Sequence, residues 1–183
     1  MNKSHLAAAL AACAVLAAPT IAAQRNPMVG GAAMYPTKTI VDNAVNSKDH
    51  TTLVAAVKAA GLVDTLSGPG PFTVFAPTNR AFAKLPAGTV DTLLQPANKG
   101  QLTSVLTYHV VPGRMTSADI AAAIKAGGGS ATVTTVQGGP LTARMRGSRL
   151  VLTDAKGGTS TVTIKDVMQS NGVIHVVDTV VMP

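Results

Sequence analysis

The segment Pro71–Phe82 predicts a buried strand that turns one corner into a helix, and it constrains the fold more than any other stretch. Apolar side chains lie on both faces of such a strand, with Phe72, Val74 and Ala76 on one face and Phe75 on the other. Pro77 ends the strand, and the Thr78 hydroxyl is suited to cap the first turn of the helix. Phe82 then points inward from that helix. The segment predicts an architecture and indicates no reaction.

Residues 1–23 have the order of a secretory signal, in which a short charged start precedes an apolar run and small residues. The charge is Lys3, and the alanine-rich run extends over Leu6–Ala18. The run before Pro19 is too short to cross a bilayer as a permanent helix. We predict cleavage after Ala23 and no transmembrane segment in the mature chain.

Cleavage leaves an N-terminal arm, residues 24–37, and a single domain, residues 38–183. Cys13 is the only cysteine, so the mature protein has no thiol and depends on packing for its stability. The sequence from Leu10 to Cys13 is similar to a bacterial lipoprotein signal, which leaves lipid attachment to Cys13 as the alternative to an ordinary signal. We expect an exported protein that is periplasmic or extracellular.

The mature chain is basic, and all of its acidic residues are aspartates. Loss of Lys3 with the signal lowers the formal net charge from +7 to about +6. A basic exported protein meets anionic surfaces such as envelope polymers, lipid head groups and acidic polysaccharides. Nucleic acid is not expected as a partner, because the basic residues are spread along the chain and aromatic side chains for base stacking are scarce.

The N-terminal arm is rich in residues that break regular structure. It also carries Met28, Met34 and Tyr35, so we expect it to lie against the domain. A pair of methionines is a pattern that soft metal ions bind, but no Cys or His is near them in the sequence. The sequence therefore favours a packing role for these residues.

Helical spacing of apolar residues predicts an α-rich first part of the domain, with helices over about Thr39–Asn46, Asp49–Ala60, after Thr78, around Val90–Leu94, over Asn98–Tyr108 and after Thr116. His50 falls in the first turn of the second helix and is expected to be exposed. His109 continues the apolar stripe of Leu102, Val105 and Leu106 and is expected inside.

The last part of the domain is predicted to be β-rich, with strands over about Thr132–Val136, Leu141–Arg146, Arg149–Thr153, Ser160–Met168 and Val173–Val177. The final strand is almost continuously apolar, interrupted by His175, and is expected to be central. Arg144, Arg146 and Arg149 bracket a tight turn and form a candidate basic patch. The alternative is a solvated strand face that discourages edge aggregation.

Three landmarks resemble, in order and separation, the two end motifs and the central Tyr-His motif of the fasciclin domain. They are the segment Phe72–Phe82, the run Tyr108-His109-Val110-Val111, and the stretch Asn171–Asp178. The resemblance covers about residues 37–183 and is closest to small secreted single-domain bacterial members. Its structural motif residues are Phe72, Phe75, Pro77, Phe82, Gly172, His175 and Asp178.

The resemblance implies an α+β fold: a wedge-shaped β-sandwich with several α-helices packed along one edge and the end motifs close together. It also implies adhesion or interaction outside the cytoplasm, with partner contacts near Tyr108, His109, Thr78 and Asn79. Animal members act as tandem repeats in a multicellular matrix, whereas this chain carries one copy.

The sequence predicts no enzyme, no metal site and no cofactor. It contains no Gly-x-Ser-x-Gly motif, and His175 and Asp178 are three positions apart on a strand, which directs them to opposite faces. The mature chain offers His50, His109 and His175 without a thiolate or a local chelating pair. Both His109 and His175 are expected to be buried and hydrogen-bonded.

Two functions are compatible with these features. The first is an interaction or adhesion module that binds a protein or an acidic glycan of the cell envelope or matrix. The alternative is a carrier of an apolar small molecule such as a carotenoid or lipid, sheltered by the methionine-bearing arm and by apolar crevices between helices. The oligomeric state does not follow from the sequence.

Overall fold

The computed structural model describes residues 26–183, and the predicted signal with Cys13 lies outside them. The described chain folds around a seven-stranded sheet in the order β4-β3-β9-β8-β7-β6-β5, and a separate hairpin, β1-β2, precedes it. The strands are β1 (Met28–Val29), β2 (Ala32–Ala33), β3 (Phe72–Pro77), β4 (Val110–Pro112), β5 (Ala131–Thr134), β6 (Pro140–Arg146), β7 (Arg149–Thr153), β8 (Thr159–Gln169) and β9 (Gly172–Val177).

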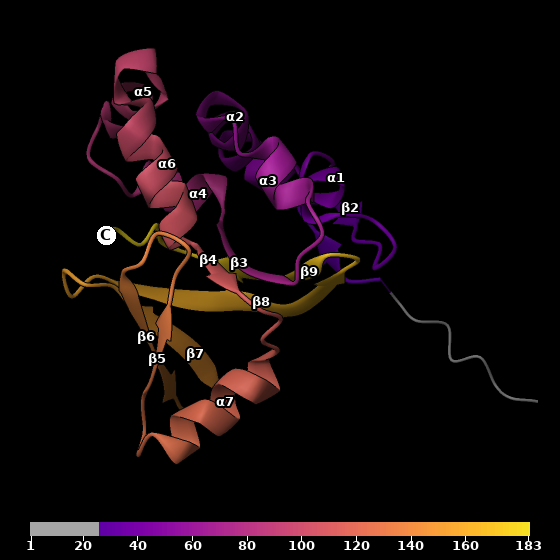
Figure 1. Ribbon diagram of the computed structural model, residues 1–183, viewed down its shortest axis with the longest axis vertical. Helices are drawn as coiled ribbons and strands as arrows, with labels where there is room; N and C mark the ends of the chain where they lie inside the picture. Colours follow the sequence, from indigo (N-terminus) through magenta and orange to yellow (C-terminus); the bar gives the residue numbers. More distant parts are fainter. Residues whose placement is uncertain (1–25) are drawn as a thin grey trace, which may run out of the picture.

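Most helices gather over one half of the sheet, and the last helix covers the other half (Figure 1). The helices are α1 (Ile40–Ala44), α2 (Thr51–Ala60), α3 (Val63–Ser67), α4 (Asn79–Ala83), α5 (Thr89–Leu94), α6 (Lys99–Tyr108) and α7 (Ser117–Ala126), with short 3-10 turns at Lys48–His50 and Pro96–Asn98. Helix α7 packs against β5 and β6. The fold is therefore α+β, as the sequence predicted.

The first and last sequence motifs lie side by side because β3 pairs in parallel with β9. The register runs from Phe72 opposite Gly172 to Pro77 opposite Val177. Strand β9 lies between β3 and β8, and every one of its residues is buried, so the prediction of a central strand is confirmed. Thr78 then caps α4 by accepting a hydrogen bond from the Ala81 N–H, 3.3 Å away.

Strand β8 joins the two halves of the sheet. Its first residues, 159–161, pair with β7, whereas residues 162–169 pair with β9 across two shifts of register. Within the irregular stretch Asp166 adopts φ = 59°, a conformation that few non-glycine residues take. Its carboxylate accepts hydrogen bonds from the N–H and the hydroxyl of Ser117, which fixes the start of α7 to the sheet.

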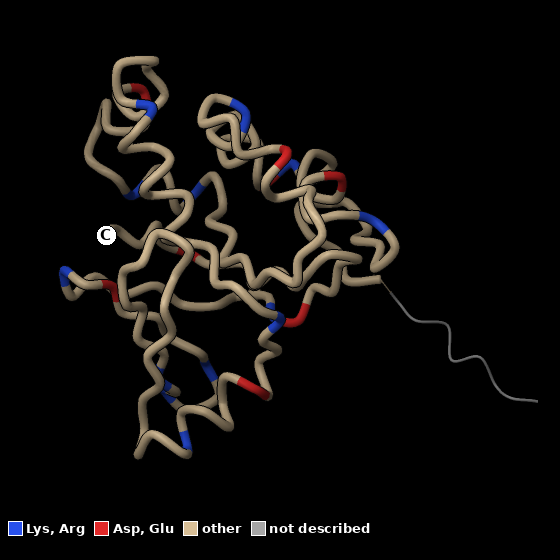
Figure 2. Tube along the Cα trace, in the orientation of Figure 1, with Lys and Arg blue, Asp and Glu red and all other residues tan. Residues whose placement is uncertain are grey.

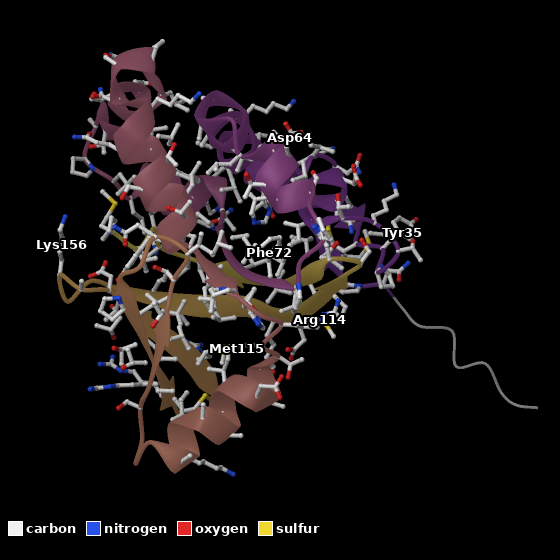
Figure 3. All side chains as sticks on the ribbon, viewed as in Figure 1. Tyr35, Asp64, Phe72, Arg114, Met115 and Lys156 are labelled. Atoms are coloured by element: carbon white, nitrogen blue, oxygen red, sulfur yellow. The ribbon has the colours of Figure 1, made fainter. Side chains whose placement is uncertain are left out.

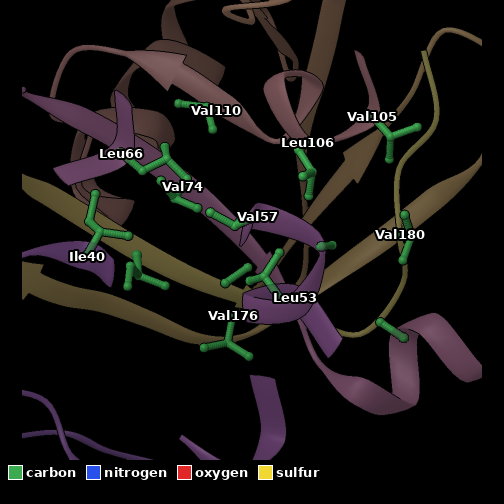
Figure 4. Close-up of a cluster of buried hydrophobic side chains, with 14 of the residues drawn as sticks. Ile40, Leu53, Val57, Leu66, Val74, Val105, Leu106, Val110, Val176 and Val180 are labelled. Atoms are coloured by element: carbon green, nitrogen blue, oxygen red, sulfur yellow. The ribbon is translucent and has the colours of Figure 1, made fainter. Parts of the chain in front are cut away.

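Two apolar clusters fill the interior. The larger lies between the helices and the β3–β9 half of the sheet, where Leu53, Val57, Val74, Leu106 and Val176 are among the buried side chains (Figure 4). The smaller lies under α7 and contains Phe75, Tyr108, Ile120, Ile124, Leu141, Leu152 and Val177. The strand β3 separates the clusters, since Val74 faces the first and Phe75 the second.

The structure differs from the sequence prediction at the N-terminal arm and at His50. The arm contains the β1-β2 hairpin, in which Met34 is buried while Met28 and Tyr35 are exposed. The prediction that His50 is exposed is wrong, because only 3% of its surface is accessible. His50 ends a 3-10 turn that points it toward the hairpin and the core, whereas the sequence suggested an α-helical first turn on the solvent side.

Candidate functional site

Tyr108 and His109 are buried where α6 ends, with accessible fractions of 0% and 2%. The Tyr108 hydroxyl donates to the Pro140 carbonyl at 2.6 Å and accepts from the Ala155 N–H at 3.1 Å. In His109, Nδ1 lies 2.8 Å from the Val105 carbonyl and Nε2 accepts from the Val181 N–H at 3.2 Å. Both side chains therefore hold the sheet and the C-terminal segment to α6. Their role in partner contact stays a prediction.

Burial determines the charge state of His109. Loss of hydration lowers its pKa from 6.5 to about 4, which outweighs the opposing effects of the Val105 carbonyl and Asp154. The ring is neutral at pH 7, with a proton on Nδ1 and a satisfied acceptor at Nε2. A ring with both nitrogens engaged in this way does not serve as a general base without rearrangement.

His175 is surrounded by groups that superficially resemble a catalytic set. Its Nδ1 accepts from the Asp166 backbone N–H at 3.3 Å, and its Nε2 lies 2.9 Å from the Met115 carbonyl. The Ser117 hydroxyl, however, donates to the Asp166 carboxylate and not to the imidazole. Burial lowers the pKa of His175, and the ring stacks on Phe75 with centroids 5.6 Å apart. The cluster links α7 to the sheet and activates no nucleophile.

Three sequence-predicted residues, Thr78, Asn79 and Asp178, meet in one open hollow of about 400 Å³ beside α4. The amide of Asn79 is engaged in capping α2, since its oxygen accepts from the Thr52 N–H at 3.0 Å and its nitrogen donates to the Lys48 carbonyl at 2.9 Å. Asn79 thus holds the fold, in agreement with its position at the start of a helix.

Asp178 is one of two acidic residues, with Asp49, that line that hollow. Burial alone raises its pKa, but hydrogen bonds from the Thr161 N–H and the Thr179 hydroxyl, together with Lys84, hold the pKa below its usual range. The Lys84 Nζ lies 3.6 Å from the carboxylate, and both side chains are about half exposed. Arg80 and Asp49 line the same hollow, which therefore carries two cations, Arg80 and Lys84, and two carboxylates, those of Asp49 and Asp178.

The three arginines of the candidate patch lie together on the outer face of the sheet. Arg146 is directly opposite Arg149 across the β6-β7 hairpin, and Arg144 is opposite Val151. Val151 is in turn opposite Thr161 on β8, so these side chains share one face. We call this surface, formed by Arg144, Arg146, Arg149, Val151, Thr159 and Thr161, the arginine face.

The arginine face is hollowed and has no counter-charge of its own. Residues of the face together with Gly147 and Ser148 line an open depression of about 440 Å³. Strands β6 and β7 carry basic residues and no acidic ones (Figure 2). Among the described residues, Lys84 with Asp178 is the only ion pair. Like charges placed directly opposite each other on a sheet are destabilising. An anion bound between Arg146 and Arg149 would therefore reduce the repulsion between them.

A cleft continues from the arginine face toward α7. The ladder between β7 and β8 ends at the pair Val151–Thr161, although both strands extend beyond it. The resulting gap of about 710 Å³ is lined by Arg149, Lys165, Ser117 and Thr163, among others. Thr163 also lines the hollow beside α4. Hydroxyls and cations therefore extend over one continuous concave surface, which also includes the carboxylate of Asp178.

Lys84 and Lys165 are residues of this surface that the sequence did not indicate. Each is isolated in the sequence. The position of Lys165 in the cleft depends on the irregular course of β8, and that of Lys84 in the hollow beside α4 depends on the parallel pairing of β3 with β9. The alternation of side chains along β6 predicted that Arg144 and Arg146 share one face, because both residues belong to the same strand. No comparable local signal marks the two lysines.

An apolar cavity of about 40 Å³ lies between α1, α2, α6 and the sheet, lined by residues such as Val41, Val57, Leu106 and Ile174.

Within residues 26–183, no three His, Cys, Asp or Glu side chains gather in a way that could hold a metal ion. In the same part of the chain, no helix combines the length and apolarity that a bilayer crossing requires.

Comparison with known proteins identifies relatives over almost the whole chain. The family model for the fasciclin domain matches residues 48–183. Protein sll1483 of Synechocystis sp. is 45% identical over 174 residues, covering 92% of this chain and 89% of the relative. Immunogenic protein MPB70 of Mycobacterium bovis is 38% identical over 200 residues, covering 98% of this chain and 94% of the relative.

Among solved structures, a FAS1 domain pair from the insect cell adhesion molecule fasciclin I superposes with a TM-score of 0.69 at 21% identity. The match covers 80% of this chain and 51% of the insect chain. At this level of identity the likeness concerns the fold alone.

Proposed function

The chain belongs to the fasciclin domain family, and from this premise we propose that it is an exported interaction module that binds an acidic glycan of the cell envelope or matrix through the arginine face. The module performs no catalysis. Its binding surface is the face itself, extended by the cleft beside α7 and by the hollow beside α4.

The observation that carries the proposal is the pair of opposed arginines, Arg146 and Arg149, exposed over a hollow and without an acidic neighbour on either strand. Guanidinium groups present a planar set of donors that matches carboxylate and sulfate groups. Hydroxyls of Thr159 and Thr161 on the adjacent strand supply the neutral hydrogen bonds that sugar rings require. The open shape suits a linear chain that passes across the face.

The burial of two histidines supports a non-catalytic role. Within the described part of the chain, His109 and His175 have both ring nitrogens engaged with backbone groups. Neither ring therefore offers a free acid or base at the surface.

Replacement of Arg144, Arg146 and Arg149 by Ser is expected to weaken binding to polygalacturonate about 10- to 100-fold at low salt, since each exposed charge pair contributes about 0.5–1 kcal/mol. The wild-type affinity should itself fall as salt rises, because screening shortens the reach of exposed charges. Co-sedimentation or retention on the immobilised polymer measures both effects.

A matched control removes the same charge elsewhere, by Ser substitutions of Lys48, Lys58 and Lys99 on the helical half of the protein. This variant should retain most of the binding. If the control variant lost as much affinity as the arginine variant, net charge alone would explain binding, and the arginine face would be rejected as the binding site. Equal binding to neutral dextran would also exclude the proposal.

The apolar cavity supports a second candidate, the carriage of an apolar small molecule. Its walls are almost entirely hydrocarbon. At about 40 Å³ it is smaller than the roughly 150 Å³ cavity that accommodates benzene, so a carotenoid or lipid would have to part α2 from α6. Protein purified from its native host should then yield an extractable pigment or lipid. A colourless, lipid-free preparation that binds the acidic polymer favours the first function.

A further inference from the structure

The N-terminal hairpin brings a methionine and a histidine to one small cavity. Met34 follows β2 and is 2% exposed, and His50 is 3% exposed. Both line a small, partly open space of about 20 Å³ with Val29, Ser47 and Ala76 among its other walls. The hairpin is held there by a hydrogen bond from the Lys48 N–H to the Gly30 carbonyl. Helix α1 separates Met34 from His50 in the sequence, which is why the pairing was not predicted.

His50 has one engaged nitrogen and one free nitrogen. Its Nδ1 lies 2.9 Å from the Ser47 hydroxyl. Its Nε2 is the only buried side-chain nitrogen or oxygen among the described residues that makes no hydrogen bond. A buried polar atom without a partner costs free energy unless something binds to it. The ring orientation is thus fixed by Ser47, while the backbone of Ala76 lies near the ring without completing a hydrogen bond to Nε2.

We propose that Met34 and His50 bind one Cu(I) ion, through Sδ and Nε2, at the base of the N-terminal hairpin. Thioether sulfur selects soft ions such as Cu(I), and imidazole is a common copper ligand. A hydrogen bond at the other ring nitrogen, here with Ser47, is the usual device that orients a ligating histidine. Two donors suffice for a monovalent ion of this kind.

The surroundings favour a soft monovalent ion over a hard or divalent one. No carboxylate lines the cavity, and oxygen ligands are what Mg²⁺ and Ca²⁺ require. Structural zinc takes four ligands, often thiolates, which these walls do not provide. Burial lowers the pKa of His50 and outweighs the opposing effects of the Ala76 backbone and Asp49, so the imidazole is neutral, as a metal ligand must be. The charge of Asp49 would offset part of the cost of a buried cation.

The volume admits one ion or one water molecule, because about 10–15 Å³ is the minimum for a water. A water at this place would have to bond to Nε2 and to the few other polar groups of a mainly apolar wall. A copper ion would be satisfied by the nitrogen and the sulfur together. Metal binding therefore explains both the free nitrogen and the buried thioether.

The test uses Ag(I), a redox-inert analogue of Cu(I), and the full chain with Cys13→Ser in every protein so that no thiol competes. Calorimetric titration should show one strong site per protein, and the melting temperature should rise on binding. Met34→Leu preserves volume and hydrophobicity and should weaken binding at least about tenfold. Long-range ¹H–¹⁵N correlation spectra should show a shift of His50 Nε2, with His109 and His175 unchanged.

The control is Met28→Leu, which removes an exposed thioether from the same hairpin and should leave the affinity within about twofold. Equal Ag(I) affinity in wild type and in Met34→Leu would overturn the proposal. So would the lack of a saturable site, which would leave the cavity to a water molecule. Both outcomes are independent of the arginine face, so glycan binding and metal binding succeed or fail separately.

Discussion

Lowering the pH from 7.5 to 4.5 should remove about 2–3 kcal/mol of unfolding free energy through His109 alone. The pKa of this residue is about 4 in the folded protein, against the ordinary value of 6.5 that applies to the unfolded chain. Between these values the unfolded chain binds more protons than the native state, so stability is complete above pH 6.5 and declines as the pH falls. The lowered pKa of His175 acts in the same direction. Urea unfolding at a series of pH values measures the slope.

His109→Gln isolates the contribution of His109, because Gln keeps a donor and an acceptor but does not titrate in this range. At pH 7.5 the variant should be about 1–3 kcal/mol less stable than wild type, since the backbone partners Val105 and Val181 are less well matched. The difference should shrink as the pH approaches 4.5.

Val105→Ala serves as the matched control for this experiment. It removes buried methyl groups beside His109 and lowers stability without altering a titrating group. It should therefore retain the wild-type dependence on pH. If His109→Gln lost as much stability on acidification as wild type does, the neutral, buried state of His109 would be disproved.

Local patterns predicted those parts of the fold that depend on neighbouring residues. The cap at Thr78 and the burial of His109 both follow from spacing within a few positions. The strand Arg149–Thr153 was predicted with its observed bounds, and β6 differed by one residue. The three landmarks then supplied the family and, with it, the closeness of the end motifs that no local rule contains.

The remaining features depend on contacts between distant segments. His50 was expected to be exposed because a helical first turn usually is, but the hairpin covers it. The hairpin itself is too short for a periodic signal. Lys165 joins the concave surface because β8 is irregular near Asp166, and a single lysine in a strand does not indicate such a position. Charged and polar side chains are spread widely over the molecule. Lys156 and Tyr35, for example, lie on opposite sides of it in Figure 3.

Asn171 gives the largest expected effect of a single polar substitution in the end motifs. Its amide oxygen accepts from the Ile40 N–H at 3.0 Å, and its amide nitrogen donates to the Leu66 carbonyl at 2.8 Å and to the Gly68 carbonyl at 3.1 Å. One buried side chain therefore fixes the start of α1 and the end of α3 to β9. These are the helix ends at which backbone groups lack partners within the helix.

Asn171→Ala should lower the unfolding free energy by about 2–4 kcal/mol, because it leaves one donor and two acceptors without partners in a largely water-excluded site. The melting temperature should fall by about 6–12 °C for a chain of this size. Asn98→Ala is the control, since its amide makes one hydrogen bond, to the Thr92 carbonyl, at the surface; it should cost less than about 1 kcal/mol. A similar loss in both variants would show that water replaces the bonds of Asn171, and that the helices are held to β9 by apolar packing alone.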